Sequence, residues 1–424
     1  MNSRQRYIIH LDMNSYFASV EQQANPWLRG KSIGVVATLS PNGCVIASSV
    51  EAKRKGIKTG CRVQDARRLD PSVIFIPNDA SKYRSCTEGI LRIMRRYTED
   101  IEQYSIDEAF LDLTGFVHSL PEAAQVAELI RRDIQAEVGE WLKCSVGVAP
   151  TRWLAKFAGD TAPKNGTLLI HEDNLSTTLD PRPVTDAWGI ASRLEWRLHN
   201  LGIYTLGELR QAPVANLMQA FGILGYQLWA NMNGIEYGGV QRTGQPKSIG
   251  HSHVFAKRAT SLQYPKAILA KLCEKAGRRL RRLGLEAGSV WLSYGLADEF
   301  RARYGRVGGG GGRKLGAPIT ETRDIWRVCW QLLTTDLPLG AVPNFLAMSL
   351  TSLRPASAQL SFWPRQKQEN NPALAVALDH LNDAYGDFTV TRGTFWGLDE
   401  RDAPDRVGFR KTVLVDDVTG TYTW

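Results

Sequence analysis

The alternation of apolar and polar residues predicts an ordered series of strands and helices at the start of the chain. YIIHLDM (7–13) reads as a short buried strand that ends on a carboxylate, and NSYFASVEQQA after it has helical spacing. IGVVAT (33–38) and CVIASS (44–49) flank SPNG, which predicts two strands joined by a hairpin turn. SVIFIP (72–77) indicates another strand, followed by a helix that Ser81 is expected to cap.

The next stretch predicts the rest of one sheet. IEQYSIDEAFLDLTG (101–115) alternates across a turn-like SIDE and reads as a hairpin, EAAQVAELIRRDIQAEVG as an amphipathic helix, and KCSVGVAP as a strand. The order strand, helix, strand, strand, helix, strand is typical of a split βαβ sheet.

The pattern changes further along the chain. Residues 185–237 predict short helices with short loops, whereas 239–248 (GVQRTGQPKS) has the composition of a linker. Strand and helix patterns resume over 249–355, interrupted by five consecutive glycines at 308–312, for which we expect a flexible loop. One helical run follows at 372–385.

Composition narrows the class of protein. Hydrophobic residues make up 43% of the 424, which excludes wholesale disorder. The six cysteines form no Cys-x-x-Cys pair, which argues against a disulfide scaffold or a zinc ribbon and favours a reducing compartment. The N-terminal apolar stretch is too short for a signal peptide, and no run is long enough to span a membrane. We therefore expect a cytoplasmic protein with no membrane partner.

The formal charge of +9 is unevenly distributed. Residues 1–240 carry 26 basic and 26 acidic side chains, residues 241–360 carry 19 and 7, and residues 361–424 carry 7 and 10. The middle segment, at +12, holds the whole excess. Such a segment fits a polyanion, because clustered Lys and Arg release counterions from phosphates, although a solvated basic face is the alternative.

Three carboxylates stand where strands are expected to end. Asp12 follows YIIHL, and Asp107 and Glu108 are adjacent in YSIDEAFLDL. Adjacent carboxylates repel each other unless a cation compensates, and Mg²⁺ prefers oxygen ligands of this kind. Two such ions about 3.5–4 Å apart can activate an attacking hydroxyl and stabilise a leaving oxygen. The alternative is a pair of solvated turn carboxylates.

Longer motifs carry a family resemblance. The chain resembles the Y-family translesion DNA polymerases, most of all their DNA polymerase IV branch, over roughly residues 6–410. The motifs that carry the resemblance, in the family's order, are HLDMNSYFASVEQ, GCVIASSVEAKRKGIKTG, YSIDEAFLDLTG, SVGVAPTRWLAKFAGD, GIYTLGELRQ and KSIGHSHVF. The resemblance implies an α+β fold: a right-hand polymerase with a ferredoxin-like palm, small fingers, a helical helix-hairpin-helix thumb and a C-terminal α/β little finger.

The resemblance also implies domain boundaries. The palm is expected at 1–12 and 79–168, the fingers at 13–78, the thumb at 169–238, the linker at 239–248 and the little finger at 249–356. A C-terminal segment would follow at 357–424.

By resemblance, the catalytic centre holds two Mg²⁺ ions. Asp12, Asp107 and Glu108 match the family's metal-binding carboxylates, and the main-chain carbonyl of Met13 is expected to complete the second site. Ser105 would support them without being a ligand. Phe17 falls at the steric gate that excludes the 2′-hydroxyl of a ribonucleotide, although its helical spacing alone predicts a core residue, as does that of Tyr16.

The triphosphate contacts depart from the family pattern. Where the family has Tyr-x-x-Arg, this chain has Val50 to Lys53, a variant similar to the polymerase V catalytic subunit. Lys53 supplies a point charge in place of a bidentate fork. The order Pro163-Lys164 is reversed relative to the family, and Lys164 is the candidate phosphate-binding lysine. Lys53 and Lys164 are thus the predicted dNTP-binding residues.

The resemblance extends to DNA-binding elements. Gly189 and Gly202 lie in helix-hairpin-helix motifs, where glycine lets backbone amides approach a phosphate. Lys247 and Ser248 are expected to contact the template backbone, and Arg278 and Arg282 to contribute from the basic KAGRRLRRLG stretch. His251 and His253 read as strand residues, not zinc ligands.

QLSFWP (359–364) resembles the peptide that bacterial polymerases insert into a sliding clamp. Its candidate clamp-binding residues are Gln359, Leu360, Phe362 and Trp363. A packed surface strand is the alternative interpretation.

The function implied is low-fidelity translesion synthesis by a monomer acting on primer–template DNA and dNTPs, with a sliding clamp as a further partner. Two other classes stay open at this point. One is a polymerase-like accessory protein that binds DNA or clamp without catalysis, and its support is the altered triphosphate contacts. The other is a nucleotide cyclase with a similar palm, which would not need a +12 segment.

Overall fold

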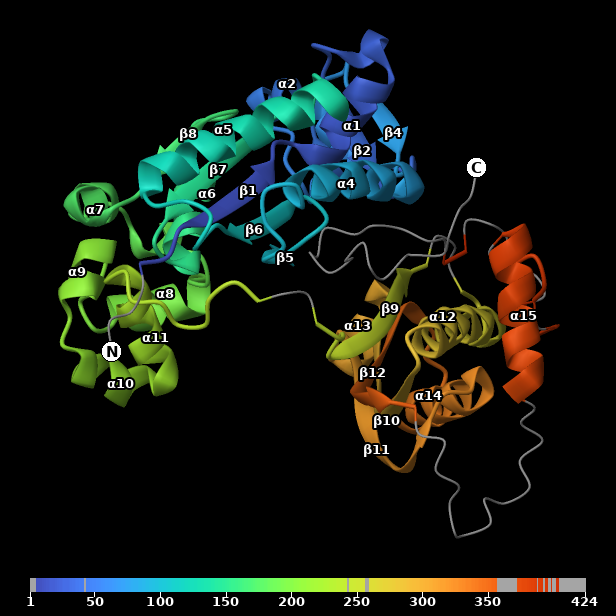
Figure 1. Cartoon of the computed structure of the whole chain (residues 1–424). Coiled ribbons are helices and arrows are strands. Elements are labelled where there is room, and N and C mark those ends of the chain that lie inside the picture. The colour runs from blue at the N-terminus through green and yellow to red at the C-terminus, as the bar shows by residue number, and fades with distance from the viewer. Residues whose placement is uncertain are drawn as a thin grey trace. The chain divides into compact units, whose positions relative to one another are not determined.

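The computed structural model divides the chain into two compact units, one reaching to Gly244 and the other starting at Gln245 (Figure 1). The residues described are 5–41, 43–241, 244–255, 259–356, 372–386, 388–391, 393–395, 398 and 402–403. None of the helices formed by these residues is long and apolar enough to cross a bilayer.

A five-stranded sheet forms the centre of the first unit. Its strand order is β5-β6-β1-β7-β8, and only β7 and β8 run parallel. The strands are β1 (Ile8–Met13), β5 (Ile101–Gln103), β6 (Glu108–Asp112), β7 (Cys144–Ala149) and β8 (Thr167–Leu169). With β1 and β6 in the middle, this is the split βαβ arrangement that the sequence predicted.

Helices cover both faces of this sheet (Figure 1). Ile9, Leu11 and Met13 of β1 share a core with α4 (Ala80–Met94) and α5 (Leu120–Glu137), whereas Ile8 packs with α6 (Arg152–Thr161) on the other face. Period-2 alternation therefore turns His10 and Asp12 toward the α6 face.

Glycines let α6 approach the sheet closely. A Cβ at Gly147 of β7 would lie 2.0 Å from the Ala155 carbonyl oxygen, and one at Gly159 of α6 would lie 2.5 Å from the His10 ring. No larger residue fits at either position. This contact fixes the helix that carries Lys156 against the strand that carries Asp12.

A small sheet inserted after β1 has the order β3-β2-β4. The hairpin of β2 (Ile33–Val36) and β3 (Val45–Ser48) is antiparallel, as predicted, and β4 (Ile74–Pro77) pairs in parallel with β2. The helices of this region are α1 (Tyr16–Ala24), α2 (Val50–Arg54) and α3 (Val63–Leu69).

Short helices complete the first unit. They are α7 (Glu172–Leu179), α8 (Ser192–His199), α9 (Leu206–Gln211), α10 (Val214–Phe221) and α11 (Ile223–Met232). Leu198, Leu206 and Leu217 join the core around α6, so this helical region packs directly on the central sheet's helix.

The second unit is built on a four-stranded antiparallel sheet with the order β11-β10-β12-β9. Its strands are β9 (Ser248–Val254), β10 (Leu285–Leu296), β11 (Gly308–Ile319) and β12 (Pro343–Pro355). Leu272 of α12 (Gln263–Arg282) and Leu333 of α14 (Thr322–Asp336) share a core with the strand residues Val290 and Leu292. The short α13 (Asp298–Tyr304) joins β10 to β11.

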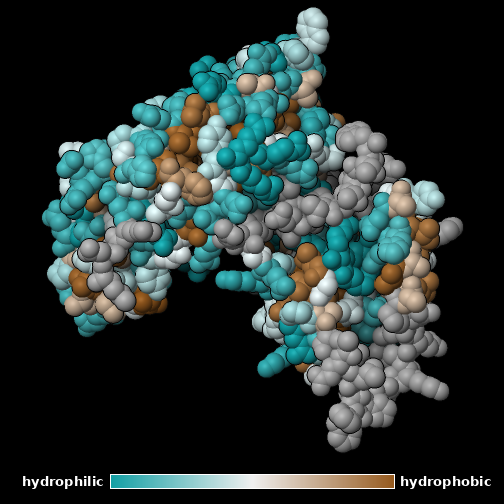
Figure 2. Space-filling model, in the orientation of Figure 1, coloured by the Kyte–Doolittle hydropathy of each residue, from teal (hydrophilic) through white to brown (hydrophobic). Residues whose placement is uncertain are grey.

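The C-terminal helix α15 (Pro372–Tyr385) belongs to this unit. It begins and ends where the sequence pattern predicted. Ala375 and Asn382 are buried, whereas Leu374 and Tyr385 are exposed, and hydrophobic residues gather over α15 in Figure 2.

Two local predictions were wrong. The glycines at 308–312 do not form a loop: they begin strand β11, which pairs with β10 from Gly308 opposite Gly295 to Gly312 opposite Trp291. Composition alone suggested flexibility, but strand pairing needs only backbone groups. In addition, α4 is capped by Asp79, which accepts from the Lys82 N–H at 3.1 Å, and not by Ser81, whose hydroxyl donates to Asp79.

Candidate active site

The three carboxylates predicted to bind metal lie on neighbouring strands. Asp12 of β1 stands opposite Glu108, the first residue of β6, in the antiparallel register. Asp107 comes just before β6, and its carbonyl accepts a 3.0 Å hydrogen bond from the Met13 N–H. Strands pair at about 4.8 Å, so these four residues are brought together at one end of the sheet.

Ser105 fixes the turn that carries Asp107. Its hydroxyl donates to the Asp107 carboxylate, and its oxygen accepts the Asp107 N–H at 3.2 Å. The Ser105 side chain is buried. Ser105 therefore supports the Asp107 carboxylate through hydrogen bonds, as the sequence predicted.

Glu108 is held by buried basic groups that the sequence reading did not assign to it. The Lys156 ammonium lies 3.2 Å from the Glu108 carboxylate and 3.1 Å from that of Asp160. His10 approaches the same Glu108 oxygen at 3.7 Å. Burial lowers the pKa of His10, although Glu108 acts in the opposite direction. The lowered pKa favours a neutral imidazole. The signal that could have found His10 is its spacing, two residues before Asp12 on the same face of β1.

The three carboxylates have the donor chemistry of a hard-cation site. Among the residues that the structure describes, no three His, Cys, Asp or Glu side chains gather closely enough to hold an ion as they stand. The chemistry nevertheless fits a hard cation, because Asp12, Asp107 and Glu108 all offer carboxylate oxygens. Asp107 and Glu108 are engaged by Ser105 and Lys156, so an incoming cation would compete with these partners.

Lys53 reaches this end of the sheet from α2. Its ammonium donates to the Ser15 hydroxyl at 2.8 Å, in the turn between β1 and α1. Burial lowers the pKa of Lys53, and the nearby Lys164 ammonium acts in the same direction, while Asp12 and Asp107 oppose it. Lys53 therefore lies within electrostatic range of Lys164, the other predicted dNTP-binding lysine, and of Asp12 and Asp107. Val50, the first residue of α2, is exposed.

The loop that carries Lys164 is pinned to the same turn. The Asn165 N–H donates to the Asn14 side-chain oxygen at 2.9 Å, and the Asn14 amide donates to the Ser145 hydroxyl at 3.0 Å. Ser145 in turn donates to the Pro163 carbonyl at 3.1 Å. Asn165 has a φ of 56°, a left-handed conformation that Asn tolerates. These contacts bring the reversed Pro163-Lys164 pair next to Asn14, two residues after Asp12.

Phe17, the predicted steric gate, lies on α1. It is 7% exposed and stacks on Tyr83, with ring centroids 4.4 Å apart. Its neighbour Tyr16 is buried, as expected, and its hydroxyl contacts the Tyr83 carbonyl and the Thr87 hydroxyl. Phe17 is thus packed in the hydrophobic core of the first unit.

The predicted DNA contacts fall on both units. Gly189 and Gly202 have φ values of 97° and 75°, which favour glycine, and a Cβ at either would meet open space. Lys247 and Ser248 are exposed at the start of β9. These four residues are accessible from solvent.

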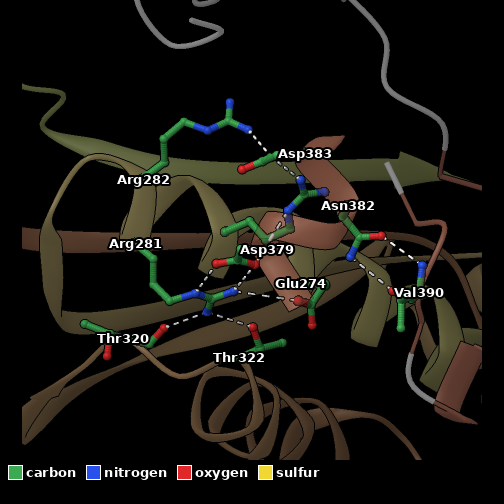
Figure 3. Close-up of polar contacts among 10 residues, drawn as sticks. Glu274, Arg281, Arg282, Thr320, Thr322, Asp379, Asn382, Asp383 and Val390 are labelled. Atoms are coloured by element: carbon green, nitrogen blue, oxygen red, sulfur yellow. Dashed lines mark hydrogen bonds and ion pairs between the residues drawn. The ribbon is translucent and has the colours of Figure 1, made fainter. Parts of the chain in front are cut away.

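Arg278 and Arg282 occupy a different environment from the one expected. Arg278 is 8% exposed and pairs with Asp383 of α15 at 2.7 Å. Arg282 reaches the same Asp383 carboxylate at 3.1 Å (Figure 3). Arg281 between them makes a bidentate pair with Asp379 at 2.7 and 2.9 Å. These guanidinium groups hold α15 against α12.

The remaining candidates are the two histidines of β9 and the clamp-binding peptide. His251 and His253 lie in β9, as expected, and the His253 ring accepts from the Ala403 N–H at 3.3 Å. The candidate clamp-binding residues Gln359, Leu360, Phe362 and Trp363 lie outside the described residues.

Comparison with known proteins gives consistent matches. Residues 11–160 match the impB/mucB/samB family, and residues 246–362 match the C-terminal domain of the same family. The chain is 33% identical over 389 residues to DNA polymerase IV of Pelotomaculum thermopropionicum, covering 91% of this chain and 94% of that protein. It is 33% identical over 399 residues to DNA polymerase IV 1 of Bacillus subtilis, covering 93% and 94%.

A solved structure supports the fold. The chain superposes on a Y-family DNA polymerase chimera with a TM-score of 0.72 at 23% sequence identity, covering 82% of this chain and 98% of that one.

Proposed function

Because the chain belongs to the impB/mucB/samB family of Y-family DNA polymerases, we propose that Asp12, Asp107 and Glu108 catalyse its nucleotidyl transfer. The chain is a DNA-directed DNA polymerase of the translesion type, and its substrates are primer–template DNA and dNTPs. The observation that carries the assignment of residues is the register that sets Asp12 opposite Glu108, with Asp107 adjacent.

Members of this family are metal-dependent nucleotidyltransferases, and we propose two Mg²⁺ ions for this chain. Asp12, Asp107, Glu108 and the Met13 carbonyl would hold them, and the bound ions would neutralise charge and activate the primer 3′-hydroxyl. The chain's own contribution is to hold those oxygens in place: Ser105 orients Asp107, and Lys156 orients Glu108. Such preorganisation is the main way proteins promote phosphoryl transfer.

Lys53 and Lys164 would bind the triphosphate of the incoming dNTP. The support is the position of Lys53 near Lys164, Asp12 and Asp107, because a cation pair with carboxylates beside it fits a ligand carrying both phosphates and bound metal. A lysine contacts phosphate as a point charge, whereas an arginine can donate two parallel hydrogen bonds. The replacement of arginine by Lys53 would therefore weaken the orientation of the triphosphate more than the affinity for it.

Phe17 would exclude the ribose 2′-hydroxyl. The stack on Tyr83 supports this role, since a ring fixed by packing cannot move aside for an extra oxygen. A small fingers region would contact the nascent pair loosely, which is the physical basis of low fidelity and lesion tolerance.

The proposed domains are those of the sequence interpretation, with palm at 1–12 and 79–168, fingers at 13–78, thumb at 169–238, linker at 239–248 and little finger at 249–356. Gly189, Gly202, Lys247 and Ser248 would hold the DNA backbone without reading sequence. We further propose that residues 359–363 bind a sliding clamp and that the chain acts as a monomer.

The test is primer extension with Mg²⁺ and dNTPs. The wild-type chain should extend a primer on undamaged and damaged templates, and Asp107→Ala combined with Glu108→Ala should not. Asp173→Asn, which changes an exposed carboxylate on α7, serves as the matched control and should leave extension unchanged. An accessory role without catalysis predicts no extension by the wild type, and that result would overturn the proposal.

A further inference from the structure

A carboxylate is buried in the core of the first unit, away from the proposed metal-binding residues. Glu21 lies in the last turn of α1 and is only 4% exposed. Taking a carboxylate out of water is costly unless charged or hydrogen-bonding partners compensate. The nucleotidyl transfer proposed above makes no use of this residue, so its burial requires an explanation.

Two side chains of α4 contact the Glu21 carboxylate. The Tyr83 hydroxyl donates to one oxygen at 2.8 Å, and the Lys82 ammonium donates to the other oxygen at 2.8 Å. Tyr83 is fully buried, whereas the Lys82 side chain is partly exposed. Because both oxygens are engaged, the orientation of the carboxylate is fixed, and its buried partner is the tyrosine.

The same tyrosine packs against Phe17. Phe17 and Glu21 are four residues apart in α1, so they lie one turn apart on the same face of the helix. The Tyr83 ring stacks on the Phe17 ring, with centroids 4.4 Å apart and an interplanar angle of 15°. Tyr83 therefore spans this face of α1, with its ring against Phe17 and its hydroxyl at Glu21.

The hydrogen bond between Tyr83 and Glu21 adds an orientation that packing alone does not supply. An apolar pair in the same space would avoid the cost of desolvating a carboxylate. A hydrogen bond to a charged acceptor is directional, so it sets the position of the ring along α1. Burial, together with the Glu21 carboxylate, raises the pKa of Tyr83, which keeps its hydroxyl protonated as a donor.

Helix α4 is in turn tied to the turn that carries Asp107. The Thr87 hydroxyl, one helical turn beyond Tyr83, donates to the Ile106 carbonyl at 2.7 Å. Thr87 and Ile106 are both buried. The position of the Tyr83 ring, and with it that of Phe17, is thereby fixed relative to a turn that carries a proposed metal-binding carboxylate.

We propose that Glu21 is a positioning residue for sugar selection, because it accepts the Tyr83 hydroxyl and so fixes the ring on which Phe17 stacks. The inference rests on the proposed role of Phe17 in excluding the ribose 2′-hydroxyl. Glu21 would act through Tyr83 and Phe17, without touching the nucleotide. When the Tyr83 ring is no longer held, Phe17 can yield to the extra oxygen, and the chain admits ribonucleotides.

The quantity that tests this is the ratio of the rNTP to the dNTP specificity constant, kcat/KM, for a single incorporation. Glu21→Leu should raise this ratio about tenfold, since a displacement of about 1 Å in a positioned group changes rates by one to two orders of magnitude. Tyr83→Phe, which keeps the ring and removes only the hydroxyl, should have a similar effect. Glu21→Gln should stay within about twofold of wild type, because its amide oxygen still accepts the Tyr83 hydroxyl.

A double-mutant cycle separates positioning from a general loosening of the core. In a Phe17→Ala background, Glu21→Leu should leave the ratio unchanged, because the ring through which it acts is absent. A merely structural role would lower the unfolding temperature without changing the ratio in the folded enzyme. Tyr97→Phe is the matched control: it removes another tyrosine hydroxyl that donates to a carboxylate, that of Asp133 at 2.6 Å, and should leave the ratio unchanged.

The outcomes are distinguishable. An unchanged ratio in folded Glu21→Leu and Tyr83→Phe, while Phe17→Ala admits ribonucleotides, overturns the inference and leaves the gate intact. An undiminished effect of Glu21→Leu in the Phe17→Ala background also overturns it, because Glu21 would then act by another route. If thermal unfolding shows that Glu21→Leu does not fold, Tyr83→Phe decides.

Two further results concern the proposed function itself. An unchanged ratio in Phe17→Ala overturns the gate and, with it, the role of Glu21. Absence of extension by the wild-type chain overturns the polymerase function on which both depend.

Discussion

The ammonium of Lys156 lies 3.2 Å from the Glu108 carboxylate, and both side chains are only 3% exposed. A buried carboxylate next to Asp107 and Asp12 would be strongly unfavourable without such a partner. Lys156 is therefore a positioning residue that holds the Glu108 carboxylate in place before any cation binds.

Removing the Lys156 charge should destabilise the chain and the site together. We expect Lys156→Met to lower the free energy of unfolding by about 3 kcal/mol, because it leaves Glu108 buried and unpaired. Urea denaturation measures the loss. Glu108→Gln in the same background should recover part of it, and two strictly additive effects would show that the residues are not coupled.

Sugar selection should depend on the Phe17 ring. Phe17→Ala should admit ribonucleotides, seen as a rise in the ratio of rNTP to dNTP incorporation in single-nucleotide assays. Tyr16→Phe is the control, since it removes a buried hydroxyl bonded to Thr87 but leaves the Phe17 stack in place. It should cost about 1 kcal/mol of stability without changing sugar selection. Unchanged selection in Phe17→Ala would remove this residue from the gate.

Helix α15 should be held by its aspartates. Asp379→Asn breaks the bidentate pair with Arg281, so amide hydrogen exchange in α15 should accelerate while that in β1 stays slow. His380→Ala, one residue along on the exposed side of the helix, is the control and should leave exchange unchanged. Equal protection of α15 in both variants would contradict the role of these ion pairs.

The small sheet should lose stability in acid through Asp70. Hydrogen bonds from Ser72 and Lys55 hold the pKa of the Asp70 carboxyl well below its ordinary value of 3.8. A lowered folded-state pKa means that the stabilisation is complete above about pH 4 and is lost as the pH falls further. Asp70→Asn should therefore be less stable than wild type at pH 7, with the difference shrinking below pH 4. Thermal unfolding at several pH values measures this, and a constant difference would count against the pairing.

Much of the fold could be predicted because its signals are local. The hairpin of β2 and β3 follows from two β-rich runs around a turn, and α15 follows from apolar spacing that ends at Tyr385. The glycine strand could not be predicted in this way, since its order comes from pairing with β10, including the contact between Gly312 and Trp291, which no local pattern encodes.

The candidate site could be predicted only in part, because its long-range contacts are not encoded in any local pattern. Asp12, Asp107 and Glu108 carry a motif, and strand register brings them together. Their partners also lie in the long motifs, but no local pattern shows which carboxylate each one contacts: Lys156 reaches Glu108 from a helix 48 residues further along the chain. Arg278 illustrates the same limit, because no local pattern in its basic run shows that it pairs with Asp383, 105 residues further along the chain.

The most direct test of the catalytic assignment is the single-turnover rate at which one dNTP is added to a saturating primer–template in Mg²⁺. Glu108→Gln, which keeps the shape of the side chain and removes its charge, should lower this rate at least about a hundredfold while the DNA dissociation constant stays within twofold of wild type. A rate within tenfold of wild type would contradict the assignment of Glu108 and its neighbours as the catalytic carboxylates.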